Sequence, residues 1–522
     1  MNNPTVDLTS GTIVGVRVGD VVSYKGIPFA APPVGDLRFA PPTPVRTWSG
    51  VKDCTGYGPI SLQHLDPLSA FIPGCEWNFY HPGAVQSEDC LNLNVWAPAN
   101  VPQSKAVLVW LHGGAFVAGS GTGLWYDGSQ LVIHEDIIVV SVNYRLGALG
   151  ALAHDESASA GNNLIRDQVA ALEWVRDNIA AFGGDPDRVT IAGESAGAIS
   201  VLALMTAPAA AGLFRAAISQ SGHGSASATR EAARSVYRRF LAELGVADSS
   251  AALTELRALD SRKIMDAQLK VTTDLRVPFR PVIDGSYLPE PIDATFAAGR
   301  VARVPLLIGT NSEESRLFAA IGWGLGPAGD DLQSRIAGLF PEGEASSQVA
   351  ELTDIYRQQA SSDEDAWLAL STDRDWRTPV RIIADGHARS GSPVFQYEFT
   401  WRSPVREGIL GASHALDIPF PFGNLDQPGV GEFVGTDAEH EAARRRIELA
   451  FRQAWGAFVR TGHPRSEVLP EWQRYEARDR ATMMLGTQSE IVKAPHQAAL
   501  DRWEALSAST LPLISMEATG NH

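Results

Sequence analysis

The sequence predicts an α/β fold, in which a mostly parallel sheet is covered by helices on both faces. Continuous apolar runs such as KAVLVWLHGG (105–114) and DIIVVSVNY (136–144) are typical of strands that are buried on both sides. The segment 164–184 carries apolar residues at helical spacing and ends at Gly183 and Gly184, which predicts a helix. Strands and helices of this kind alternate along the chain, and that order favours a parallel sheet.

The other elements follow in chain order. Residues 5–30 alternate apolar and polar residues between glycines and predict short strands, and the Pro- and Gly-rich stretch 31–88 predicts loops. Further strands are predicted at 188–193, 213–222, 304–311, 393–401 and 481–486, with helices at 198–207 and at 437–461. The stretches 229–275 and 328–392 are largely helical in pattern, and we expect them to decorate or cap the sheet.

Composition excludes several classes of protein. The chain has 522 residues and a net charge of −17, which argues against nucleic acid or an anionic membrane surface as a partner. The first residues lack a basic and apolar leader, no stretch is apolar enough to span a membrane, and there are only three cysteines, Cys54, Cys75 and Cys90. We therefore expect a cytoplasmic protein, by default a monomer.

The string TIAGESAGAIS (190–200) places Ser195 between two glycines, where a predicted strand turns into a predicted helix. This context is the one that a nucleophilic serine on a sharp strand-to-helix turn requires. Gly193 and Gly197 would leave room where a Cβ atom would collide with neighbouring backbone. The alternative is a Gly-rich turn with an ordinary surface serine, so the rest of the sequence has to supply an oxyanion site, an acid and a base.

Candidates for all three follow. His112-Gly113-Gly114-Ala115 comes directly after a predicted strand, and the N–H groups of Gly113, Gly114 and Ala196 could bind a developing oxyanion. The strand at 304–311 leads into Glu313 and Glu314, and the pattern alone does not choose between these two acids.

The base is expected after the acid, since the chain order in such sites is serine, acid, histidine. The positions available are His387, His414, His440, His463, His496 and His522. His414 lies in a Gly-rich loop beyond the strand at 393–401, from where it can reach the carboxyl edge of the sheet. We therefore predict His414 as the base.

Several strings resemble motifs of the type-B carboxylesterase and cholinesterase family of α/β-hydrolases, and they occur in the family's order. They are YKGIPFAAPPVGDLRFAPP (24–42), SEDCLNLNVWAP (87–98), WLHGGAFVAGSG (110–121), AFGGDPDRVTIAGESAGA (181–198), GTNSEES (309–315) and HALDIPFPFGN (414–424). The resemblance covers nearly the whole chain and is nearest to the bacterial p-nitrobenzyl esterase type. It implies one α/β-hydrolase domain over residues 1–522, with helical and loop insertions that form a gorge. It also implies that Glu314, rather than Glu313, is the acid, and that Glu194 is a buried structural carboxylate.

The chain departs from the family pattern near its cysteines. The family often pairs the cysteine of EDCLNLN with one upstream, but here Ser61 occupies that upstream position, so Cys90 lacks its usual partner. Any disulfide among the three cysteines is therefore in doubt. The divergent stretch 62–88 is expected to border the gorge, and Trp77 within it is expected to pack or to act as a lid.

The function predicted is hydrolysis of carboxylic esters through an acyl-enzyme on Ser195, without a metal or organic cofactor. Phe116, Trp125, Phe318 and Phe420 flank the motifs and are candidates for the substrate pocket, which would favour short or medium acyl groups and aromatic alcohols. Activity should fall below about pH 6, where a histidine of ordinary pKa becomes protonated. The alternatives are a carbamate or amide hydrolase with the same triad, and a non-catalytic binding module of the same fold.

Overall fold

A computed structural model of the chain describes residues 3–64, 74–100, 104–154, 161–275, 277–323, 329, 331–340 and 346–506, apart from the side chains of Trp77, Asp274 and Ser346. The expected role of the Trp77 side chain and residues 65–73 of the expected gorge-bordering stretch 62–88 therefore lie outside the described residues, as does His522.

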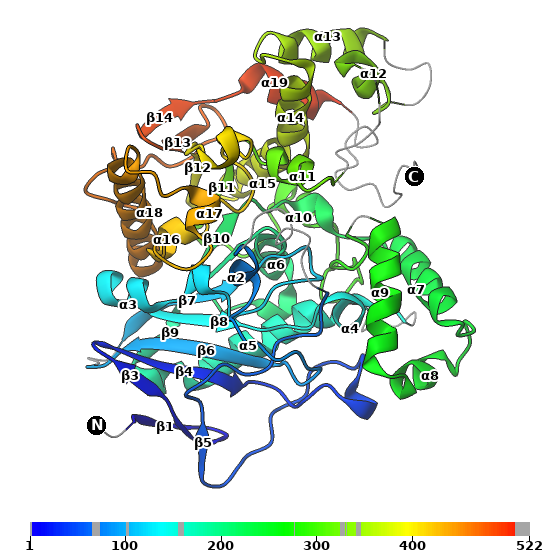
Figure 1. Cartoon of the computed structure of the whole chain (residues 1–522), viewed down its shortest axis with the longest axis vertical. Helices are drawn as coiled ribbons and strands as arrows, with labels where there is room; N and C mark the ends of the chain where they lie inside the picture. Colours follow the sequence, from blue (N-terminus) through cyan, green and yellow to red (C-terminus); the bar gives the residue numbers. More distant parts are fainter. Residues whose placement is uncertain are drawn as a thin grey trace.

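A large mixed sheet runs through the molecule (Figure 1), in the order β14-β13-β12-β11-β10-β9-β7-β8-β6-β4-β3. The strands from β13 to β8 in this order are parallel, and the pairs at both ends are antiparallel. A second, small sheet joins β1, β2 and β5. The strands are β1 (Thr5–Leu8), β2 (Gly11–Val14), β3 (Val16–Val18), β4 (Val21–Pro28), β5 (Val51–Asp53), β6 (Asn92–Pro98), β7 (Lys105–Leu111), β8 (Ile138–Val142), β9 (Gly184–Glu194), β10 (Ala216–Gln220), β11 (Leu306–Asn311), β12 (Val394–Phe399), β13 (Ala481–Leu485) and β14 (Glu490–Lys493).

Helices cover both faces of this sheet. The α-helices in the described part of the chain are α2 (Glu76–Phe79), α3 (Ser129–Glu135), α4 (Gly147–Ala151), α5 (Asn163–Asn178), α6 (Ala196–Thr206), α7 (Arg230–Leu244), α8 (Ala252–Ala258), α9 (Ser261–Asp274), α10 (Ile292–Ala297), α11 (Ser315–Ala320), α12 (Leu332–Ala337), α13 (Ser346–Arg357), α14 (Asp363–Thr372), α15 (Thr378–Arg389), α16 (Pro419–Phe422), α17 (Gly431–Val434), α18 (Glu441–Thr461) and α19 (Gln497–Ala505). The predicted α/β class with helices on both faces is confirmed.

The two faces of β7 show why its apolar run is continuous. Val107 and Val109 belong to the core cluster that includes residues of α5 and α6, whereas Leu108 and Trp110 belong to the cluster that includes α3 and α18. Successive side chains of a strand point to opposite faces, so a strand covered on both sides needs apolar residues at every position.

The stretches 229–275 and 328–392 were expected to be helical and to decorate or cap the sheet, and their described residues agree with this expectation. Helices α7, α8 and α9 lie together on the right of Figure 1, and α12, α13, α14 and α19 gather at its top around a separate apolar cluster that includes Trp367 and Trp503. Between α14 and α15 the chain forms one π-helical turn, Asp373–Arg377, which the sequence pattern did not predict. Such turns often mark functional sites. Of the described helices, none combines the length and the apolar character that crossing a membrane requires.

The three cysteines are buried and form no disulfide within the described part of the chain. Burial is the largest cause that raises the pKa of the Cys90 thiol, to about 12. The nearby Ser61 hydroxyl partly offsets this rise, and Ser61 Oγ accepts a hydrogen bond of 3.2 Å from the N–H of Leu146. Ser61 therefore stands beside Cys90, as the resemblance implied for the missing cysteine.

We expect the change Ser61→Cys to create a disulfide with Cys90. Closing the loop between these positions should raise the free energy of unfolding of the oxidised variant by about 3 kcal/mol over its reduced form. Peptide mapping without reductant and urea unfolding would measure both, with Ser61→Ala as the control for the lost hydroxyl. A variant whose thiols both stay free after air oxidation would contradict this prediction.

Candidate active site

Ser195 stands on a strained turn between β9 and α6. Its backbone has φ 54° and ψ −121°, a conformation that residues other than glycine rarely adopt. The N–H of Ser195 donates to the carbonyl of Gln220 at the end of β10, at 2.9 Å, which helps to fix the turn. Strain held in this way at a single serine is typical of a functional position.

Gly193 and Gly197 allow the turn to pack against β7. A Cβ atom on Gly193 would lie 2.5 Å from the backbone of Gly197, and one on Gly197 would lie 2.0 Å from the carbonyl oxygen of Leu111. No side chain fits at either position, so the predicted need for two glycines has a steric cause.

The glycine loop after β7 lies beside the serine. A Cβ atom on Gly113 would lie 3.2 Å from Cβ of Ser195, and Gly114 has φ +106°. Within the described part of the chain, the N–H groups of Gly113, Gly114 and Ala196 donate no hydrogen bond, and all three residues line one cavity together with Ser195. Unpaired N–H groups around a cavity are suited to binding an anionic oxygen.

Glu314 and His414 form a buried, charge-assisted pair. Oε2 of Glu314 lies 2.6 Å from Nδ1 of His414, and Oε1 accepts hydrogen bonds from Ser221 Oγ at 2.5 Å and from the N–H of Asn311 at 2.8 Å. Glu314 is fully buried. Glu313 points elsewhere, because its carboxylate contacts Arg316 and Arg402 and accepts from the N–H of Ala412. The geometry thus distinguishes Glu314, which contacts His414, from Glu313, which does not. The sequence pattern alone did not choose between these two acids.

A second carboxylate faces the other nitrogen of the same imidazole. Oε1 of Glu194 lies 3.1 Å from Nε2 of His414, and Glu194 is 3 % exposed. Burial raises the pKa of Glu194, while His414 opposes the rise. Burial alone would lower the pKa of His414, but the carboxylates of Glu194 and Glu314 outweigh it and hold this pKa above the usual imidazole value. The pair therefore retains a proton at a higher pH than an isolated histidine would.

Ser195 and His414 line the same cavity, but within the described chain Ser195 Oγ makes no hydrogen bond to His414. Nε2 of His414 instead faces Glu194. Hydrogen bonds of this kind are often absent before substrate binds.

The cavity has a volume of about 450 Å³, and its walls are mostly apolar. Two of the four aromatic residues predicted for the pocket, Phe116 and Phe318, lie on its wall. Trp125 and Phe420 do not, because both are fully buried in the core, where Trp125 packs on Phe433 and Phe420 packs on Phe399. Apolar wall residues that the sequence did not single out include Phe79, Trp110, Ile199, Leu317, Ile321, Trp323, Trp376 and Ile418.

Trp376 comes from the π-helical turn and contacts the histidine directly. Its ring centroid lies 4.5 Å from that of His414, and the ring is stacked on Phe318 at 5.7 Å. His223, just after β10, meets Trp376 edge to face at 5.4 Å and also lines the cavity. Neither residue lies in a motif, and only the unusual SQSGHG string after a predicted strand could have pointed to His223.

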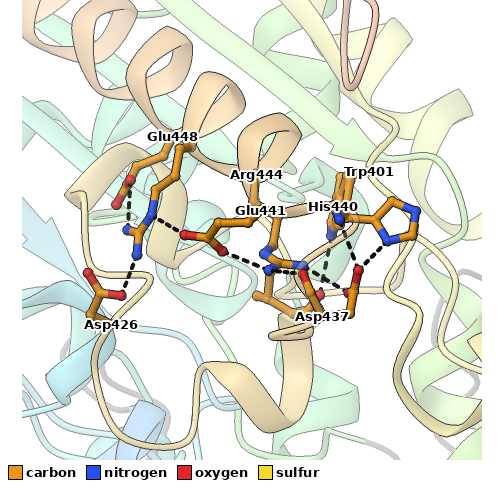
Figure 2. A network of polar contacts seen from close by, with 9 residues as sticks. Trp401, Asp426, Asp437, His440, Glu441, Arg444 and Glu448 are labelled. Atoms are coloured by element: carbon orange, nitrogen blue, oxygen red, sulfur yellow. Dashed lines mark hydrogen bonds and ion pairs between the residues drawn. The ribbon is translucent and has the colours of Figure 1, made fainter.

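The other described histidines considered as bases have different surroundings. His387 bonds the carbonyl of Val304, His463 bonds that of Pro464, and His496 pairs with Glu398. Figure 2 shows His440 at the start of α18, beside Asp437 in a chain of ion pairs that continues through Arg444 and Glu441. None of these histidines lines the cavity that holds Ser195.

A parallel sheet that carries a strained serine between a strand and a helix, with a buried acid–histidine pair beside it, defines an α/β-hydrolase. The model of the carboxylesterase family matches residues 2–503. The chain is 36% identical to the para-nitrobenzyl esterase of Bacillus subtilis over 517 residues. This alignment covers 95% of this chain and 97% of that protein. It is 33% identical over 505 residues to the phenmedipham hydrolase of Pseudarthrobacter oxydans, with 94% and 97% covered. A solved carboxylesterase from Geobacillus stearothermophilus superimposes with a TM-score of 0.83 at 35% identity, over 96% of this chain and 99% of its own.

The chain belongs to the carboxylesterase family. The resemblance inferred from its motifs is confirmed, and the protein is a serine carboxylesterase that acts on small carboxylic esters.

Proposed function

We propose that Ser195, His414 and Glu314 are the nucleophile, base and orienting acid of this carboxylesterase. The observation that carries the proposal is the 2.6 Å contact between Glu314 and Nδ1 of His414, at the wall of the cavity that Ser195 lines. A carboxylate on Nδ1 fixes the imidazole tautomer that leaves Nε2 free to accept the serine proton.

In the proposed reaction, Ser195 Oγ attacks the ester carbonyl as its proton passes to Nε2 of His414. The N–H groups of Gly113, Gly114 and Ala196 stabilise the oxyanion that forms, and His414 returns the proton to the leaving alcohol. Water then cleaves the acyl-enzyme by the same route. Loss of one oxyanion donor typically costs about 3 kcal/mol of transition-state stabilisation.

The cavity fits esters with short or medium acyl chains, or with aromatic alcohols. Its volume of about 450 Å³ and its aromatic walls suit a drug-sized apolar substrate. We expect a series of 4-nitrophenyl esters from acetate to palmitate to give the highest kcat/KM well below the twelve-carbon acyl chain. An optimum at twelve carbons or beyond, or faster turnover of a matched anilide or carbamate than of the ester, would reject this substrate class.

Glu194 sets the pH at which His414 becomes a base. The enzyme needs neutral His414, and the nearby Glu194 carboxylate favours the protonated form, so kcat/KM should still be rising through neutral pH. The midpoint of the acidic limb of the pH profile should therefore lie above the value near pH 6 that the sequence led us to expect. We predict that Glu194→Gln moves the midpoint of this limb down by about one pH unit. A pH profile of kcat/KM for both forms tests this, and a midpoint that stays fixed or moves upward would contradict it.

We further propose that residues 1–522 act as one catalytic domain of a bacterial, cytoplasmic and monomeric enzyme that binds neither nucleic acid nor membranes. The net charge of −17 supports the last two points. Sedimentation of the purified protein would test the monomer.

A further inference from the structure

Asn311, the last residue of β11, joins the segment that carries the acid to the loop that carries the base. It is fully buried and is not among the described residues that line the cavity. Its N–H donates to Oε1 of Glu314 at 2.8 Å. Its side-chain Nδ2 donates at 2.7 Å to the carbonyl of Ser413, which directly precedes His414, and at 3.2 Å to Oδ1 of Asp417. One residue therefore binds both members of the acid–histidine pair or their immediate neighbours.

The side-chain amide of Asn311 makes its hydrogen bonds only as a donor. Both partners of Nδ2 are acceptors, a carbonyl and a carboxylate oxygen, and this fixes which end of the amide faces them. Oδ1 is buried and has no hydrogen-bond partner in the described part of the chain. A buried acceptor without a partner lowers stability, and in a native protein it calls for an explanation. The two bonds that the same amide donates provide one.

Backbone bonds also join the acid segment to the loop of His414. The N–H of Glu313 donates to the carbonyl of Ala412 at 2.9 Å, two residues before the histidine. The N–H of His414 itself reaches the carbonyl of Glu314 only at 3.4 Å, which makes this bond a weak one. The bond of 2.7 Å from Asn311 to the residue directly before the histidine is shorter than either.

Asp417 fixes the far end of the same stretch of loop. Its Oδ2 accepts hydrogen bonds from Nε2 of Gln220 at 2.9 Å and from the hydroxyl of Tyr397 at 3.1 Å. Gln220 ends β10 and Tyr397 belongs to β12, the two strands that flank β11 in the sheet. The amide of Asn311 is thus bonded to a carboxylate that the neighbouring strands hold, and the loop on both sides of His414 is tied to the end of the sheet.

We propose that Asn311 is a positioning residue, whose side-chain amide holds the loop of His414 at the distance from Glu314 that proton transfer from the serine requires. This inference rests on the triad proposed above. Asn311 lies outside the cavity and acts only through His414. Its effect on the rate can still be large, because a displacement of about 1 Å at a catalytic group can reduce the rate about 100-fold.

The test removes the amide and keeps the backbone N–H that holds Glu314. Asn311→Ala leaves space and Asn311→Val fills most of it, so an effect that both variants share comes from the lost hydrogen bonds rather than from packing. Asn162 is the matched control. It is also fully buried, and its Nδ2 donates at 2.7 Å to the carbonyl of Val282 and at 2.7 Å to Oδ2 of Asp284, away from the cavity.

Both Asn311 variants should lower kcat for 4-nitrophenyl acetate by about 10- to 100-fold. KM should stay within about twofold of that of the unmodified enzyme, because Asn311 does not line the cavity. Asn162→Ala and Asn162→Val lose the same kinds of hydrogen bond, so their unfolding temperatures should also fall, but their kcat should stay within about twofold.

The pH profile of kcat/KM gives a second readout, which a general loss of stability does not move. Burial lowers the pKa of His414, and three carboxylates around it, those of Glu194, Glu314 and, with a smaller effect, Asp417, raise it. A looser contact with Glu314 would raise this pKa less. The midpoint of the acidic limb should therefore move down by about half a pH unit in the Asn311 variants and stay in place in the Asn162 variants.

Three results would each overturn the proposal: kcat within twofold of the unmodified enzyme in both Asn311 variants, an equal loss of kcat in the Asn162 variants, or a midpoint that stays fixed or moves up. His414→Ala separates this outcome from a failure of the proposed function. Undiminished turnover by His414→Ala would reject the triad itself. An inactive His414→Ala, together with Asn311 variants that behave like the unmodified enzyme, would reject only the role of Asn311.

Discussion

Replacing Ser195 with alanine should reduce kcat for 4-nitrophenyl acetate by about 10⁴-fold or more, with the fold intact. The serine oxygen forms the acyl-enzyme, and no other described hydroxyl occupies the strained turn beside the N–H groups of Gly113 and Gly114. The residual rate would come from oxyanion stabilisation and substrate binding alone. The effect is read from initial rates corrected for spontaneous hydrolysis.

Ser200 offers a matched control. It lies on the same helix, fully buried, and accepts a hydrogen bond from Gln168 rather than lining the cavity. Ser200→Ala should lose some stability, about 1 kcal/mol, and keep its kcat within about threefold. Undiminished turnover by Ser195→Ala would show that Ser195 is not the nucleophile.

The change Glu314→Gln should reduce kcat by about 10⁴-fold, a loss comparable with that of other triad acids. The amide cannot balance the imidazolium that forms as His414 takes the serine proton, and it also favours the wrong tautomer at Nδ1. Stopped-flow and steady-state rates on the same ester would show the loss in the chemical step, with KM changing little.

The neighbouring acid, Glu313, provides a control that distinguishes the general charge of the region from the specific position of Glu314. Glu313→Gln removes a carboxylate one residue away that contacts Arg316 and Arg402, so it should change stability modestly and leave kcat within about threefold. Equal losses in the two variants would mean that Glu314 acts only through the general charge of the region.

Local patterns were enough to predict the parallel strands from β7 to β13, the turn at Ser195 and the loop that bears His414, because each depends on neighbours in the chain. They did not predict β5, β6 or β14. The continuous apolar run of β7 reflects cover on both faces, and Gly193 and Gly197 reflect backbone contacts within the turn. The choice of Glu314 over Glu313 needed either the family resemblance or the structure, since adjacent acids look alike in sequence.

The walls of the cavity could not be predicted in this way. Trp376 and His223 lie far from Ser195 in sequence, and only the assembled fold brings His223 to Trp376 and Trp376 to His414. Trp125 shows the converse. It lies near motif residues in the sequence, yet its side chain packs in the core against Phe433. Closeness to a motif in sequence is a weak guide to the direction of a side chain.

The most direct test of the central claim is covalent labelling with an organophosphate, followed by mass spectrometry of the digested protein. The mechanism predicts one adduct per chain, on the peptide that carries Ser195, with activity lost in proportion to labelling. It also predicts no adduct in Ser195→Ala. Loss of activity with the adduct on another residue, or full labelling of Ser195 with activity retained, would contradict the account.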